Sequence, residues 1–224
     1  MNKFLAICAF ALAMPMSNPA FAYIKCDKKA DAKKKKKCEK KMAKTLAKKR
    51  ANTTPIKPSD VGSEFAYMDG GNIFDTDDWY LGMKKTGIKD IDAINHKVYA
   101  AKGLIRLTVY AGHLNKSDKA AAQKLGGKLA PRLAKMEEEL NGITEEINKF
   151  DASKLSGMDA VKGGAALIKT GVDVVATIAE VPGAVAALAP IVKGGAKSAV
   201  GNAVNQAKGA AGDAVNKAKN AAGQ

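Results

Sequence analysis

The stretch PRLAKMEEELNGITEEINKF, residues 131–150, carries the clearest structural pattern in the chain. Its apolar residues recur at alternating steps of three and four, which places them on one face of an α-helix: Leu133, Met136, Leu140, Ile143, Ile147 and Phe150. Such a heptad seam is typical of a helix that packs against a nearly antiparallel neighbour. A coiled coil needs at least about three or four heptads, so the pattern favours a helix of an intramolecular bundle over an oligomerisation helix.

Helical patterns also precede this seam. The same steps of three and four predict a helix over 90–112, with Asp90 or Asp92 available to cap its first turn. Ser117 and Asp118 can begin the next helix. Glycine at 126 and 127 and proline at 131 disfavour helix, so a kink or a break is expected just before the seam.

The segment after the seam is dominated by small apolar residues. On a helical wheel the charged residues of 160–180 fall in one narrow stripe, so a helix there must be buried on most of its sides. Val181-Pro182-Gly183 predicts a turn, and a second apolar piece follows it as far as Val192. The sequence therefore predicts an apolar helical hairpin over 158–192, interrupted too often by charge to be a standard membrane-spanning helix.

Together these patterns predict an all-α fold. A small helical bundle over 91–196 is expected, flanked by a flexible basic N-terminal arm and a marginal amphipathic C-terminal tail. The arm and a linker occupy 23–54, because the threonines and prolines of 52–60 break helices. Residues 55–90, which contain several glycines and five of the twelve aromatic residues, are expected to be irregular.

The tail, residues 197–224, contains an 11-residue repeat. AVGNAVNQAKG at 199–209 is followed by AAGDAVNKAKN at 210–220, and 11 residues make nearly three helical turns. Over this segment the chain resembles the 11-residue repeats of late embryogenesis abundant proteins and, more loosely, of apolipoproteins. The resemblance implies a weak amphipathic helix that becomes ordered on a surface.

The first 22 residues have the features of a cleavable export signal. Lys3 is followed by an apolar run over 4–14, and Ala20-Phe21-Ala22 precedes the expected cut. The apolar run is too short for a membrane-spanning helix, which needs roughly 20 residues. We therefore expect an exported protein, located in a periplasm, at the outer envelope surface or outside the cell.

Two cysteines, Cys26 and Cys38, follow the signal, and in an oxidising compartment they are expected to form a disulfide. Twelve residues of α-helix would separate their Cα atoms by about 18 Å. A disulfide requires about 4.4–6.8 Å. The geometry predicts either a lysine-tipped loop with an intramolecular bridge or a helix whose cysteines pair between chains, and the loop is favoured.

Positive charge is concentrated in the same arm. Of the net charge of +15, residues 23–50 carry +11. The candidate anion-binding residues are twelve lysines and one arginine: Lys28, Lys29, Lys33, Lys34, Lys35, Lys36, Lys37, Lys40, Lys41, Lys44, Lys48, Lys49 and Arg50. Such a block attracts anionic lipids and polymers. Nucleic acid is a less favoured partner, because no aromatic residue lies between Lys25 and Arg50 to stack on bases.

Catalytic and metal-binding patterns are weak. No Cys, Asp or Glu stands at a zinc-like spacing from His96 or His113, and Asp75-Thr76-Asp77-Asp78 resembles a calcium loop but has Tyr80 where glycine is required. The sequence therefore predicts a protein that is not an enzyme, with no cofactor and no metal. It is expected to bind anionic envelope surfaces or polymers through the arm. The alternative is a secreted membrane-inserting or pore-forming protein that uses the apolar hairpin 160–192. The sequence also allows homo-oligomers that form through residues 131–150 or through an intermolecular disulfide.

Overall fold

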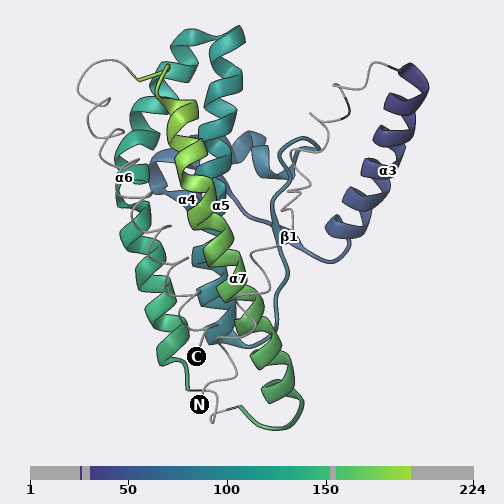
Figure 1. The fold of residues 1–224 in the computed structure, drawn as a ribbon, viewed down its shortest axis with the longest axis vertical. Helices are drawn as coiled ribbons and strands as arrows, with labels where there is room; N and C mark the ends of the chain where they lie inside the picture. The colour runs from purple at the N-terminus through teal and green to yellow at the C-terminus, as the bar shows by residue number, and fades with distance from the viewer. Residues whose placement is uncertain (1–25, 27–30, 152–154, 193–224) are drawn as a thin grey trace, which may run out of the picture. The chain divides into compact units, whose positions relative to one another are not determined.

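The computed structural model describes residue 26 and residues 31–151 and 155–192 (Figure 1). The predicted leader, 1–22, and the repeat tail, 197–224, lie outside the described residues, as do Lys28 and Lys29. The chain divides into two compact units, and the division falls between Gly87 and Ile88.

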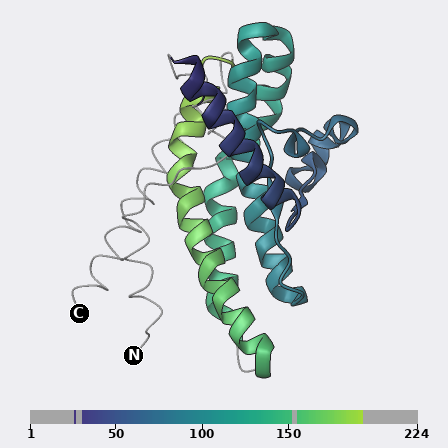
Figure 2. The same ribbon diagram turned by 90° about the vertical axis from the view of Figure 1, so that its right-hand side faces the viewer.

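The second unit is a bundle of three long helices: α5 (Lys89–Ser117), α6 (Lys119–Lys149) and α7 (Gly157–Leu188). Each helix contacts the other two, and they lie side by side in Figures 1 and 2. Thr170 of α7 contacts Asn95 of α5, and Ala187 lies beside Gly112 farther along both helices, so α5 and α7 run parallel. The all-α fold expected from the sequence is confirmed.

The heptad seam of α6 is buried, as its spacing predicts. Leu133, Met136, Leu140 and Ile143 are at most 5% exposed. Burial of each such side chain stabilises the fold by roughly 1.5–3 kcal/mol. Ile147 and Phe150, at the end of the seam, are only half-buried.

The predicted break before the seam is wrong, because α6 continues through Gly126, Gly127 and Pro131. Proline inside a helix costs about 3 kcal/mol, since it removes one backbone hydrogen bond and crowds the preceding turn. Leu129 and Leu133 flank Pro131 and are at most 2% exposed. Their burial contributes roughly 3–6 kcal/mol, which offsets the cost of the proline.

The predicted apolar hairpin is also wrong. Helix α7 runs without interruption from Gly157 to Leu188 and contains Pro182. Side chains on both sides of the proline, including Val181 and Val185, are at most 3% exposed and hold the helix against the bundle. Packing again outweighs the local tendency of the Pro-Gly pair to turn the chain.

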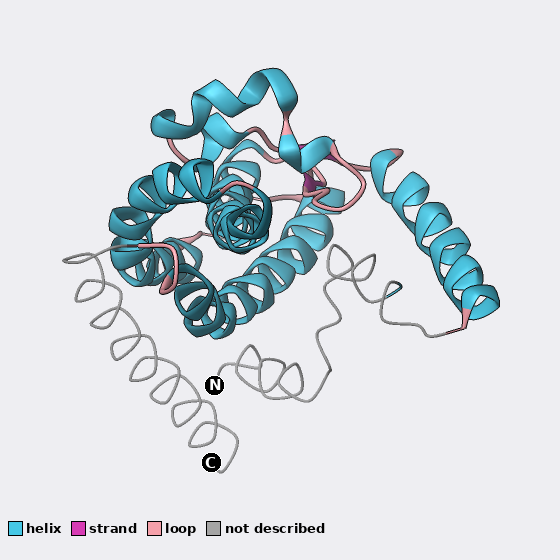
Figure 3. Cartoon of the chain, turned by 90° about the horizontal axis from the view of Figure 1, so that it is seen from above, coloured by secondary structure: helices cyan, strands magenta, loops and turns pink. Residues whose placement is uncertain are grey.

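The first unit contains one long helix and several short elements. They are α3 (Ala32–Arg50), β1 (Thr54–Pro55), α4 (Pro58–Val61), the 3₁₀ helices η2 (Ser63–Gly71) and η3 (Ile73–Asp75), and β2 (Gly82–Met83). Strands β1 and β2, magenta in Figure 3, pair antiparallel with Thr54 opposite Met83. Phe65 and Phe74 are completely buried and form the centre of this unit with other apolar side chains.

The predicted linker over 52–60 is instead part of this folded unit. Ile56 is 3% exposed, its backbone N–H donates to the carbonyl of Leu81, and its own carbonyl accepts from the Asn72 side chain. Prolines at 55 and 58 occupy places that suit them, a strand end and the first turn of α4. The boundary expected near residue 55 therefore lies at 87 instead.

Candidate functional site

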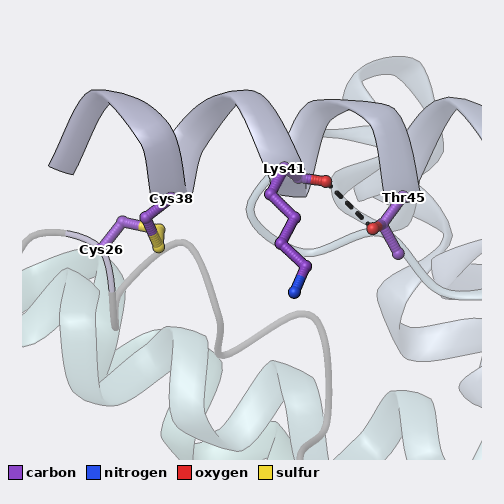
Figure 4. The surroundings of a disulfide bond; sticks show 4 residues. All are labelled: Cys26, Cys38, Lys41 and Thr45. Atoms are coloured by element: carbon purple, nitrogen blue, oxygen red, sulfur yellow. Dashed lines mark hydrogen bonds between the residues drawn. A yellow bond between two sulfur atoms is a disulfide. The ribbon is translucent and has the colours of Figure 1, made fainter. Parts of the chain in front are cut away.

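Helix α3 contains ten of the predicted anion-binding lysines. Asp31 caps its N-terminus, because one carboxylate oxygen accepts hydrogen bonds from the backbone N–H groups of Lys33, at 2.8 Å, and Lys34, at 3.2 Å. Lys48, Lys49 and Arg50 occupy its last turn, where positive charge interacts favourably with the helix dipole. Figure 4 shows the middle of the helix, where the Thr45 hydroxyl donates to the Lys41 carbonyl.

The two sides of α3 differ in chemistry. Cys38, Met42 and Leu46 lie on one side, where Leu46 is buried and the other two are half-buried. The opposite side presents a row of exposed lysines: Lys33, Lys37, Lys40, Lys44 and Lys48. These five residues, which we call the lysine stripe, fall within about 80° of the helix circumference and extend over about 22 Å.

The lysine stripe is a concentrated positive charge with little internal compensation. Within the described part of the chain, none of its five side chains has an ion-pair partner. Like charges at steps of three or four destabilise a helix by about 0.2–0.5 kcal/mol per pair. An anion bound along the stripe would relieve this repulsion.

A disulfide joins the helix to the preceding chain. Cys26 and Cys38 are bonded, with a Cα–Cα distance of 5.7 Å, as Figure 4 shows. The predicted lysine-tipped loop is wrong, because Lys33–Lys37 are helical while the bridge lies within the same chain. Helix α3 begins at Ala32, after Asp31 in an extended conformation, so the chain is not one continuous helix from Cys26 to Cys38 and the separation of about 18 Å expected for such a helix does not apply.

Arg50 has a structural role at the other end of α3. Its guanidinium donates to the Asp77 carboxylate at 2.7 Å and to the backbone carbonyl of Asp75. It also lies over the ring of Tyr80, 5.2 Å from the ring centroid. These contacts attach the C-terminal end of α3 to its own unit, so Arg50 serves in them and not in the lysine stripe.

The predicted residues thus separate into groups. Five form the lysine stripe, and Lys34, Lys36 and Lys41 are exposed beside it. Lys35 and Lys49 lie toward the other side of the helix, as helical spacing requires. The sequence could have indicated this stripe, because its steps of four, three, four and four match a helix, but the assumed loop concealed it.

Sequence reasoning missed a polar seam between α5 and α7. Lys102 of α5 pairs with Asp173 of α7 at 2.7 Å, and both side chains are about one-fifth exposed. Lys169 contacts the other oxygen of the same carboxylate. Burial acts to raise the pKa of Asp173, but Lys102 and Lys169 outweigh it, so the pKa lies below its ordinary value.

The polar seam continues on both sides of that pair. The Thr170 hydroxyl donates to the Asn95 side chain, and both residues are buried. Arg106, 6% exposed, also faces this seam, and burial lowers its pKa to about 10. Specific polar contacts of this kind fix the register of two packed helices.

The described residues contain no group of three or more His, Cys, Asp or Glu side chains that could hold a metal ion. Helix α7 is the single described helix long and apolar enough to cross a membrane.

Comparisons with protein families, curated proteins and solved structures found no match to this chain.

Proposed function

We propose that this protein is a non-enzymatic binder of anionic envelope surfaces or polymers, and that the lysine stripe of α3 makes the contact. The observation that supports this proposal is the alignment of five exposed lysines along one side of a helix that is held by a disulfide at Cys38 and by the contacts of Arg50 at its C-terminal end. An export signal at 1–22 would deliver the protein to a periplasm, the outer envelope surface or the medium, where such polyanions occur.

Electrostatic attraction of this size is sufficient for binding. A basic residue near an anionic membrane contributes about 1 kcal/mol, so the five stripe lysines contribute about 5 kcal/mol at low salt. That free energy corresponds to an affinity gain of more than about a thousandfold. The gain falls as salt rises, because ions screen exposed charges beyond about 10 Å at 0.1 M.

The helical form of α3 adds geometric order to the attraction. Consecutive stripe lysines are separated by about 4.5–6 Å along the helix axis, so a surface or polymer with closely spaced negative groups can contact several of them together. The ordered helix has already lost backbone entropy that a disordered arm would lose on binding. The face contains no aromatic side chain, which favours lipid headgroups or acidic polymers over nucleic acid bases.

The proposal can be tested with a charge-matched pair of variants. One replaces the five stripe lysines with Gln, and the other replaces five exposed lysines outside α3 with Gln: Lys84, Lys85, Lys116, Lys119 and Lys124. Both lose the same charge. We expect the stripe variant to lose most of its binding to anionic vesicles in low salt, while the control variant keeps most of it. Equal losses would show that net charge alone, and not α3, determines binding.

A further inference from the structure

Helix α7 has two apolar sides, but the bundle covers only one of them. The buried side includes Leu167, Val174 and Val181, which pack against α5 and α6. The other side carries apolar residues at helical spacing: Met158, Val161, Ala165, Ile168, Val172, Val175, Ala179 and Ala186. We call this second side the outer face.

The outer face is open within the described part of the chain. Met158 and Val161 are each 70% exposed and Val175 is 37% exposed. Gly164, Gly171 and Gly183 lie on or beside this face, and a Cβ atom added at any of them would meet nothing within 4 Å. Only 33% of the most apolar stretch of α7 is buried inside the protein. A core helix of a soluble protein would be mostly buried.

Charged residues lie along one edge of the outer face. No acidic residue lies on the face, whereas Lys162 and Lys169 are exposed along one edge of it. Asp173 and Glu180 lie on the same edge, where Asp173 pairs with Lys102 and Lys169 and Glu180 interacts electrostatically with Arg106. Counted with Lys102 and Arg106 of α5, this edge carries four cationic and two acidic side chains. Its charge is therefore net positive, which suits lysines that extend toward anionic headgroups while apolar neighbours contact acyl chains.

We infer that the outer face of α7 is a lipid-contacting surface that lies along an anionic bilayer with its apolar side chains among the upper acyl chains. From Val161 to Ala186 the face extends over about 37 Å of helix. Contact requires no opening of the bundle, because six of the eight apolar side chains are already exposed and the other two, Ile168 and Val172, are half-buried. The polar seam keeps the opposite side of α7 attached to α5. This inference rests on the proposed function, which brings the protein to an anionic surface.

A bilayer fits these observations better than a second copy of the chain. Helix α7 is long enough to cross a membrane and contains an 18-residue stretch that is apolar enough to do so, a property that a contact between proteins does not require. Two copies packed antiparallel through this face would also bring their lysine edges toward each other. Charge complementarity therefore favours anionic lipid as the occupant.

The direct test places a tryptophan on the outer face of the full, oxidised protein. Trp79 is the single tryptophan, so the variant Trp79→Phe provides a dark background in which Val161→Trp reports on position 161. Anionic vesicles with brominated acyl chains are then added. We expect a blue shift and quenching that persist in high salt. An emission spectrum unchanged in the presence of bound vesicles would overturn the lipid contact.

A second pair of variants measures the contribution of the face to binding. Val161→Gln with Val175→Gln removes apolar area from the outer face, while Tyr67→Gln removes a 59% exposed aromatic residue from the other unit. We expect the first variant to bind anionic vesicles in high salt at least about tenfold more weakly, and the second to bind as the parent does. Equal binding by all three proteins would contradict the inference.

The outcomes separate this inference from the proposed function. Binding in low salt without quenching at position 161 overturns the lipid contact and leaves the lysine stripe intact as the binding surface. Absence of binding in low salt overturns both proposals. If the outer-face variant instead abolishes a dimer in sedimentation without lipid, and quenching is absent, the face is a contact between copies. If the tryptophan at position 161 is quenched only in a variant that lacks residues 193–224, that segment is the occupant of the outer face. Either result rejects lipid as the occupant.

Discussion

Removing the Cys26–Cys38 disulfide should release the N-terminal half of α3. The bridge closes a loop over a sequence separation of 12 residues, and loop-closure entropy gives it a stabilising effect of about 3 kcal/mol. Against it stand about nine pairs of lysines at steps of three or four on α3, each of which costs about 0.2–0.5 kcal/mol. The total repulsion is about 2–4 kcal/mol, so the disulfide and the repulsion are of similar size.

The prediction is tested by amide hydrogen exchange on the oxidised protein and on the double variant Cys26→Ser and Cys38→Ser. We expect protection over 33–42 to fall about 100-fold in the variant, which is the factor that 3 kcal/mol produces. Protection near Arg50 should change less, because its contacts with Asp77 and Tyr80 are independent of the bridge. A soluble polyanion should restore part of the lost protection by relieving the repulsion.

A matched control applies the same reducing agent to the parent and to the double variant. The parent should lose protection over 33–42, whereas the variant, which lacks the bridge, should not respond. Equal protection of α3 in the parent and in the double variant would refute the reasoning. It would mean that packing of Leu46 and its neighbours, and not the covalent link, keeps the lysine stripe helical.

Three further predictions concern the bundle. Leu140→Ala, at a completely buried position, should lower the free energy of unfolding by about 2–5 kcal/mol in chemical denaturation, and an unchanged midpoint would contradict the seam. Pro131→Ala, at an exposed position inside α6, should raise thermal stability by about 2 kcal/mol, because it restores a backbone hydrogen bond, whereas a decrease would indicate that the proline ring is packed. Asp173→Asn should cost about 2 kcal/mol at neutral pH. The pKa of Asp173 is lowered in the folded state, so its contribution to the free energy of unfolding is complete above its ordinary pKa. That contribution is lost as pH falls through the folded-state pKa. The stability of the variant should therefore decrease less in acid than the stability of the parent.

The sequence predicts the bundle well where apolar spacing is regular. The steps of 133–143 and of 91–105 identified helices whose apolar faces are buried. It fails where a local signal meets strong packing: Pro131 and Pro182 both suggested an interruption, and both lie inside long helices. Helix propensities are small compared with the burial of several leucine-sized side chains, and sequence alone does not show which of the two is present.

The candidate site was identified by composition, but its form was not. The loop interpretation treated the whole interval between the cysteines as one conformation, whereas helix α3 begins at Ala32, within that interval. The polar seam depends on which residues of α5 face Asp173. The sequence does not show this, because Lys102 and Asp173 are distant in the chain and meet only when α5 packs against α7. The exposure of the outer face of α7 was likewise not predicted, because the simplest interpretation of an apolar helix in a sequence is a buried core helix.

The central claim is that the lysine stripe of α3 binds anionic surfaces. The most direct measurement is the affinity of the parent and of the five-lysine stripe variant for anionic vesicles as a function of salt concentration. The account predicts an affinity for the parent that falls as salt rises, and for the variant a much lower affinity in low salt with a shallower dependence on salt. A variant that binds as tightly as the parent in low salt, with the same dependence on salt, would contradict the account.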